Sequence, residues 1–269
     1  MDSPGLIEFL ETVGSAVHSL NTVCVGLHGV ERSKFEKPEE LTVSWHTNDP
    51  IASARKSRLF AVKASFVFVE EALLQYLKYA AKHPLAPEAV RKALSADSAA
   101  ERIEELAKVV VLKKNYWAPM VMLMIHWRNR FVHASSKACL KPEQRKLLLR
   151  EASAIKENHA SIDIQDTLSH FDKNSVTLKD ASTLIAVSIR LARNIDELLA
   201  ISGMSRDSIR YYLEYNEMAS EYRNVLKING VEVRERKVRA FFKTYLPFVD
   251  ETMLASIIVD PIEFGLDRR

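Results

Sequence analysis

The chain has 269 residues, of which 47% are hydrophobic and 27% charged, enough apolar material for a sizeable core under a polar surface. Only 7 residues are glycine, well below the roughly 7% of an average chain, and none lies between Gly29 and Gly203, which excludes a glycine-rich phosphate loop there. The net charge of +3 and the two cysteines, Cys24 and Cys139, exclude a strongly charged chain and a disulfide or cysteine-based zinc framework.

Hydrophobic side chains recur at helical spacing along most of the chain. Helices are therefore expected, in chain order, over residues 6–27, 51–82, 87–94, 98–113, 119–134, 141–156, 181–201, 205–226 and 233–245. Asn48 or Asp49 is a candidate N-cap ahead of Pro50. Thr177 or Asp180 is a candidate N-cap later in the chain, and the next glycine, Gly203, is expected to end that helix.

Other stretches are expected to be non-helical. Residues 30–50 and 158–175 are polar, and a short strand is predicted at 41–45. Asn229-Gly230 lies between apolar residues and predicts a β-hairpin.

Together these elements predict an all-α protein, an antiparallel helical bundle with a small C-terminal helical and hairpin extension. We expect an N-terminal helix and linker over residues 1–50, the bundle over 51–203 and a basic module over 204–269. Met1-Asp2-Ser3-Pro4 lacks the basic start of a signal peptide, and the apolar run 118–125 is too short to span a membrane. A cytoplasmic location without membrane contact is expected, and the low cysteine count fits it.

Basic residues are concentrated in two blocks. Residues 126–150 hold seven Lys or Arg against Glu143, and residues 223–243 hold seven against Glu232 and Glu235. Such blocks favour contact with a polyanion such as RNA, and two ordinary solvated faces are the alternative.

The sharpest local feature is the sequence His126-Trp127-Arg128-Asn129-Arg130-Phe131-Val132-His133 in an otherwise apolar helix. Arg128 shares a helix face with apolar residues, and an arginine there must be paired or lie at an interface. Glu70 or Glu71 of the long helix is a candidate partner for Arg128 or Arg130.

The segment from Arg128 to His133 resembles the signature of the HEPN family: an arginine, a polar residue, three further residues and a histidine. In HEPN domains this motif lies on a late helix of a bundle, beside a long first helix, and the resemblance covers residues 50–202. Some HEPN toxins carry a tyrosine two residues after the histidine. Ser135 stands there in this chain, so control by modification of that tyrosine is not implied.

The resemblance implies a metal-independent endoribonuclease without a cofactor, of the kind that acts as a defence or stress effector. It implies that His133 is the general base, that Arg128 stabilises phosphoryl charge and that Asn129 orients the phosphate or His133. Titration near neutrality and bidentate contact with phosphate suit histidine and arginine to these roles. His126, Arg130 and Lys137 are expected to bind the RNA backbone.

A homodimer is expected for two reasons. Arg128 and His133 are five residues apart, about 140° on an ideal helix, so one copy does not easily aim both at one phosphate. HEPN proteins also usually dimerise through this region. A regulatory or neutralising protein partner is a further expectation.

Two alternatives to the ribonuclease remain open. One is a HEPN-like domain that binds RNA or nucleotide without cleavage, and the other is a helical interaction or regulatory module. A metal site formed by His159, Asp163, Asp166 and His170 is a weaker hypothesis, because the segment is polar and lacks cysteine.

Overall fold

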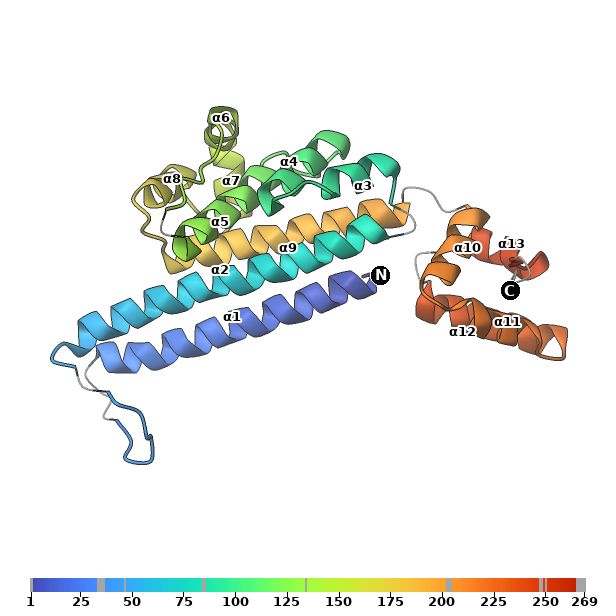
Figure 1. Ribbon diagram of the computed structural model, residues 1–269, viewed down its shortest axis with the longest axis horizontal. Coiled ribbons are helices and arrows are strands. Elements are labelled where there is room, and N and C mark those ends of the chain that lie inside the picture. Colours follow the sequence, from blue (N-terminus) through green and yellow to red (C-terminus); the bar gives the residue numbers. More distant parts are fainter. Residues whose placement is uncertain are drawn as a thin grey trace.

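The computed structural model describes residues 2–32, 37–45, 47–83, 86–133, 135–201, 205–246, 249 and 251–264. Within these residues every regular element is a helix, which confirms the all-α fold. The helices are α1 (Pro4–Glu31), α2 (Pro50–Lys82), α3 (Glu88–Leu94), α4 (Ala99–Val109), α5 (Trp117–Val132), α6 (Pro142–Arg150), α7 (Ala152–Asn158), α8 (Ile164–Asp172), α9 (Leu178–Ile201), α10 (Arg206–Tyr215), α11 (Ala219–Leu226), α12 (Val231–Tyr245) and α13 (Glu251–Val259). Figure 1 shows α1, α2 and α9 as long neighbouring rods, with α3 to α8 on one side and α10 to α13 beyond one end.

The two long helices α1 and α2 both begin at a proline that follows a capping residue. The Ser3 hydroxyl accepts the Leu6 N–H at 3.2 Å, and the Asp49 carboxylate accepts the Ala52 N–H at 2.9 Å. The predicted cap at Asp49 is therefore confirmed. Buried side chains of α1, among them Leu6 and Phe9, belong to the same hydrophobic core as α2, α5 and α9.

Gly5 permits a close approach of α1 to α2. A Cβ atom at this position would lie 2.2 Å from Cδ1 and 2.4 Å from Cγ of Tyr79, well inside van der Waals contact. Gly5→Ala is therefore expected to lower the free energy of unfolding by about 1–3 kcal/mol, despite the better helix propensity of alanine. Urea unfolding measures the change.

Gly14, also in α1, is the matched control. A Cβ atom there meets no atom within 4 Å. Gly14→Ala is therefore expected to stabilise the chain by up to about 1 kcal/mol. Equal stabilisation by both alanine variants would contradict the steric role of Gly5.

Helix α5 runs through the centre of the larger core. Its side chains from Trp117 to Ile125 are buried, and so is Trp127. The Trp127 ring centroid lies 6.2 Å from that of Phe66 in α2 and 5.5 Å from that of Phe171 in α8. These contacts fix the position of the last two turns of α5, which carry the polar motif.

Helix α8 contradicts the expectation of an irregular segment over residues 158–175. The Asp163 carboxylate caps it by accepting the N–H groups of Gln165 at 2.9 Å and of Asp166 at 3.3 Å. Ile164, Leu168 and Phe171 are spaced four and three residues apart and are buried together on one face. A short helix with one apolar face reads as polar when its composition is averaged.

Three further expectations were wrong in detail. Residues 41–45 form no strand. The helix expected over 141–156 is divided at Glu151 into α6 and α7. The helix expected over 205–226 is divided into α10 and α11, with Glu217 between them at a φ of 58°.

Helices α10 to α13 form a second hydrophobic cluster around Tyr212, Tyr222 and Phe242. Asn229-Gly230 joins two helices of this module rather than two strands, so the hairpin prediction was wrong. Gly230 has a φ of 90° and its carbonyl accepts the N–H of Arg234 in the first turn of α12. An Asn-Gly pair can supply the positive φ needed both in a β-hairpin turn and in a turn between two helices. The helical spacing of the apolar residues that follow decides that a helix forms here.

Both residues proposed as N-cap of the helix after residue 177 take part in the cap of α9. The Asp180 N–H donates to the Thr177 hydroxyl at 3.1 Å, and the Thr177 N–H donates to the Asp180 carboxylate at 2.9 Å. Gly203, the expected end of this helix, lies outside the described residues. None of the helices in the described part of the chain is both long and apolar enough to cross a membrane.

Candidate active site

The motif residues up to Val132 lie in the last two turns of α5, between α2 and α8, and His133 follows directly. Arg128 Nε forms an ion pair with Glu70 Oε2 of α2. This is one of the pairings predicted between Glu70 or Glu71 and Arg128 or Arg130. The Glu70 side chain is 4% exposed and that of Arg128 is 21% exposed. Burial raises the pKa of the Glu70 carboxyl above its ordinary value, and the Arg128 guanidinium opposes this rise. The pair therefore holds a cation at the edge of the core with one side towards solvent.

Asn129 is the second contact of the Arg128 guanidinium. Its side-chain Oδ1 accepts a hydrogen bond from Arg128 Nη1 at 3.1 Å. This contact uses the carbonyl end of the Asn129 amide, so the NH₂ end of this half-buried side chain is the end left to donate to a ligand.

His133 follows the last helical residue of α5. It is the C-cap, with a φ of −116° and a ψ of 102°, and its N–H donates to the Asn129 carbonyl at 2.9 Å. The His133 side chain is exposed. Its N–H still makes the i to i−4 hydrogen bond of a helix, so its Cα atom keeps its register on α5, while its ψ turns the chain away from the helix after this residue. The separation of about 140° from Arg128 on an ideal helix and the homodimer expected from it both stay predictions.

The three residues expected to bind RNA occupy different surroundings. Arg130 donates from Nε to the Ala138 carbonyl and from Nη1 to the Phe171 carbonyl, both at 2.8 Å, and its Cζ lies 3.8 Å from the Phe171 ring centroid. It fastens the segment after α5 to the end of α8. His126 is half-buried. Its pKa is lowered mainly by burial and to a smaller extent by the nearby positive charge of Arg130. Lys137 is exposed.

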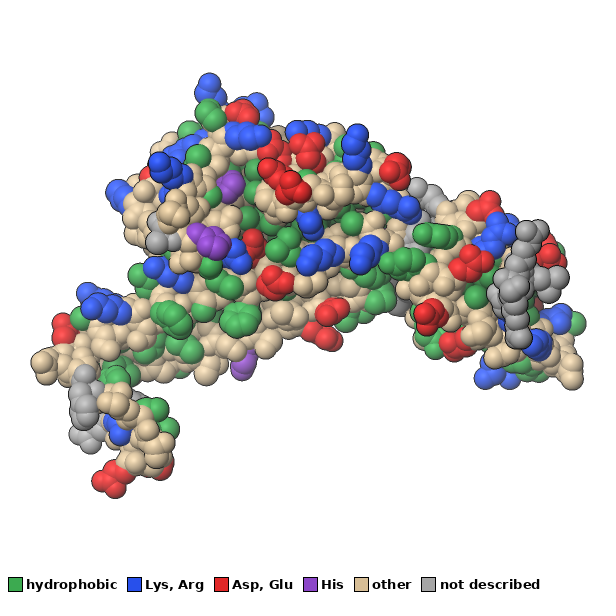
Figure 2. All heavy atoms as spheres, viewed as in Figure 1, with side chains coloured by type: hydrophobic (Ala, Val, Ile, Leu, Met, Phe, Trp, Pro, Cys, Tyr) green, Lys and Arg blue, Asp and Glu red, His purple; other side chains and the backbone are tan. Residues whose placement is uncertain are grey.

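Most of the basic block over residues 126–150 is already paired. Besides the contacts of Arg128 and Arg130, its ion pairs are Lys141 with Glu104, Arg145 with Asp172 and Arg150 with Glu151. Among the described residues, no ion-pair partner is seen for Lys137 or Lys146. Figure 2 shows Lys and Arg side chains gathered over α6 and α8, at the end of the bundle where α5 also ends.

The second basic block, in the C-terminal module, is partly neutralised too. Arg239 forms ion pairs with Glu235 and Glu251, and the Arg223 guanidinium lies 5.1 Å from the Phe264 ring centroid. Arg236, Lys237 and Lys243 are exposed.

Three of the four residues of the hypothetical metal site make separate contacts. His159 Nδ1 lies 3.0 Å from Arg190 Nη1, His170 Nδ1 lies 2.9 Å from Asp180 Oδ2, and Asp163 caps α8. In the described part of the chain no group of three His, Cys, Asp or Glu side chains is placed to hold a metal ion.

Sequence reasoning missed the two carbonyl groups that hold Arg130. They belong to Ala138 and Phe171, and main-chain acceptors leave no mark in the side-chain pattern. The apolar spacing Ile164–Leu168–Phe171 is the signal that indicates α8 and hence the position of Phe171.

Comparisons of the chain with protein-family models, with curated proteins and with solved structures give no match. The candidate site therefore rests on its own residues and geometry, and the likeness to HEPN domains stays a prediction.

Proposed function

We propose that the chain is a metal-independent endoribonuclease whose catalytic residues are Arg128, Asn129 and His133. The observation that supports this is the fixed guanidinium of Arg128. Glu70 and Asn129 hold it at a partly exposed position, and an exposed histidine ends the same helix. A fixed cation can stabilise charge on a phosphoryl group and a histidine can serve as general base, so this helix end carries both groups that metal-independent cleavage of a phosphodiester uses.

The proposed reaction starts at a ribose 2′-hydroxyl. His133 accepts its proton, and the 2′-oxygen forms a bond to the adjacent phosphorus. The bond from phosphorus to the 5′-oxygen breaks, and the departing oxygen takes a proton from water. The products are a 2′,3′-cyclic phosphate and a 5′-hydroxyl, and no metal or cofactor takes part. Arg128 stabilises the charge on the phosphoryl oxygens, while the Asn129 NH₂ group donates to one of them.

The proposal includes a second copy of the chain and an RNA backbone as partners. Exposed Lys137 and Lys146 follow the motif in the chain and are suited to phosphate contacts. His126 and Arg130 are proposed at the edge of the RNA path, with Arg130 acting mainly through the segments that it fastens.

Cleavage of end-labelled RNA in EDTA tests the proposal. Wild-type protein is expected to cleave and to leave cyclic phosphate and 5′-hydroxyl ends. His133→Ala is expected to lower the rate by about 100-fold or more, and Arg128→Lys, which keeps the charge but not the planar fork, by about 100-fold.

His18→Ala is the matched control, because His18 is an exposed histidine of α1 away from the motif. It is expected to cleave like wild type. Absence of cleavage by the wild-type chain, its loss in EDTA, or an unchanged rate in His133→Ala would each contradict the proposal. Salt-dependent RNA binding without cleavage would favour the binding domain instead.

A further inference from the structure

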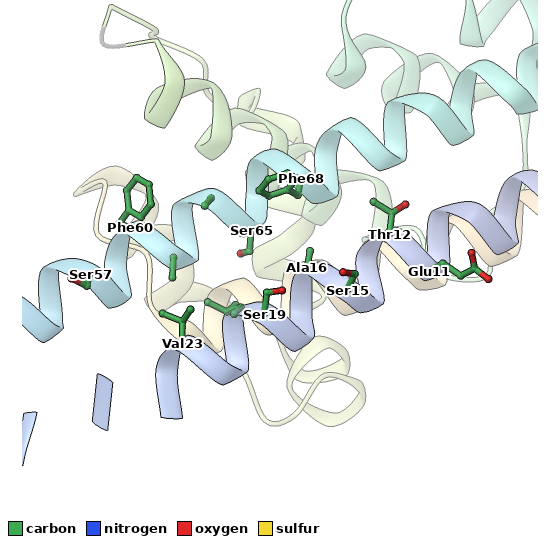
Figure 3. A pocket seen from close by; sticks show the side chains of 13 residues that line it. Glu11, Thr12, Ser15, Ala16, Ser19, Val23, Ser57, Phe60, Ser65 and Phe68 are labelled. Carbon is green, nitrogen blue, oxygen red and sulfur yellow. The ribbon is translucent and has the colours of Figure 1, made fainter. Parts of the chain in front are cut away.

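A groove of about 700 Å³ runs along the seam between α1 and α2. Small side chains of both helices line it, among them Ser15, Ala16 and Ser65, and Figure 3 shows Phe60 and Phe68 projecting from α2 along it. Phe60 is 74% exposed and Phe68 is 61% exposed. Two phenylalanines exposed beside an apolar groove are costly in water and mark an interaction surface.

The outward face of α2 has an ordered sequence of chemical types. Lys56, Phe60, Ala64 and Phe68 follow one another at intervals of four residues, and Glu71 comes three residues later, so all lie on one stripe. The Glu71 carboxylate is exposed and accepts a hydrogen bond from Gln75 at 2.7 Å. The stripe therefore has a cation at one end, an anion at the other and a small residue at its centre.

We propose that this face binds a second copy of the chain, with α2 antiparallel to the partner's α2 about a two-fold axis at Ala64. Such an axis places Phe60 opposite the partner's Phe68, because the two positions are equally far from Ala64. It also brings Lys56 to the level of the partner's Glu71. A parallel arrangement would instead bring like charges together.

A two-fold interface needs one patch that is complementary to itself. The stripe satisfies this condition, since it carries large rings, a groove of small residues that receives such rings and both charges of an ion pair. The small side chain of Ala64 at the centre lets the two helices approach closely.

The proposed axis lies at the level of the candidate active site. Lys63 Nζ is 4.9 Å from the Phe131 ring centroid, so the end of α5 lies close to the residue of α2 that precedes Ala64. In the proposed dimer, the two copies of the segment from Arg128 to His133 therefore lie at the same height along the paired α2 helices, close to the two-fold axis. This step rests on the proposed function, whereas the binding surface itself does not.

Sedimentation velocity and light scattering of the full chain test the surface. The wild-type chain is expected at twice its chain mass at micromolar concentration. The double variant Phe60→Asp/Phe68→Asp is expected at the chain mass with an unchanged circular dichroism spectrum, because both side chains are exposed. Val111→Asp, at a position 89% exposed elsewhere, is the matched control and is expected to remain dimeric.

Charge exchange tests the antiparallel register. Lys56→Glu and Glu71→Lys are each expected to weaken the dimer, and the double variant to restore it. Ala64→Cys, with Cys24 and Cys139 replaced by serine, is expected to form an interchain disulfide under mild oxidation, while Val111→Cys in that background is not. A monomeric wild type, a dimer insensitive to the aspartates or absence of the Ala64→Cys cross-link would overturn the proposal.

Association and cleavage can fail separately. A monomeric Phe60→Asp/Phe68→Asp variant that cleaves RNA at the wild-type rate would show that cleavage needs no second copy and would leave the binding surface intact. A monomeric wild type that cleaves RNA would refute the surface and leave the proposed chemistry intact.

Discussion

An Arg128→Ala variant is expected to lose about 3 kcal/mol of its free energy of unfolding near neutral pH, because it leaves Glu70 as a buried carboxyl without a counter-charge. Glu70→Ala is expected to cost less, about 1–2 kcal/mol, since the Arg128 guanidinium it leaves behind reaches water. Urea unfolding of both variants beside wild type measures this asymmetry.

The loss in Arg128→Ala is expected to depend on pH. Burial raises the pKa of the Glu70 carboxyl, and in this variant the opposing guanidinium is gone. A carboxyl with a higher pKa in the folded than in the unfolded chain contributes stability below its unfolded pKa. That contribution is lost as the pH rises through the folded pKa. Stability of Arg128→Ala relative to wild type should therefore fall from pH 4.5 towards pH 7.

A deficit that is the same at every pH would contradict this account and would assign the loss to packing alone. The prediction also decides how the catalytic test is designed. Loss of RNA cleavage in Arg128→Ala confounds chemistry with folding, whereas Arg128→Lys retains a cation for Glu70. His133 is exposed, so the His133→Ala variant carries no such penalty.

Features of the fold that depend on residues adjacent in the sequence were predictable. Asp49 before Pro50 marks the start of α2, because an N-cap and a first-turn proline act within one turn. Asn229-Gly230 shows the limit of the same reasoning. The pair requires a turn, but the residues that continue the chain decide whether helices or strands meet there.

The candidate site, too, was predictable only in part. A charged pair for Arg128 follows from the apolar helix that carries it, and Glu70 was one of two candidate partners. The point where α5 ends was not predictable, because nothing in the side-chain pattern places His133 outside the helix. The contacts of Arg130 are with main-chain carbonyls of distant segments, which only the folded chain brings close.

His83 connects the bundle to the C-terminal module. Its ring centroid lies 5.6 Å from that of Tyr79 in α2 and 5.5 Å from that of Tyr212 in α10, and the residue is 5% exposed. Burial, assisted by the charge of Arg91, lowers the pKa of His83 from 6.5 to about 4. Neutral His83 therefore stabilises this contact above pH 6.5, and the stabilisation is lost as the pH falls towards 4.

Local opening of α10 is expected to be roughly 20-fold more frequent at pH 5 than at pH 7, about 2 kcal/mol in free energy. Amide hydrogen exchange of residues 209–213, corrected for the intrinsic pH dependence of exchange, measures this. His83→Phe keeps the ring contacts and removes the titrating group, so it should abolish the effect, while His18→Phe should leave it unchanged. The pKa of buried His159 is also lowered to about 4, but its ring contacts Tyr116 and Arg190 in the bundle. If the opening of α10 at pH 5 persists in His83→Phe, His83 is not the group that controls the contact.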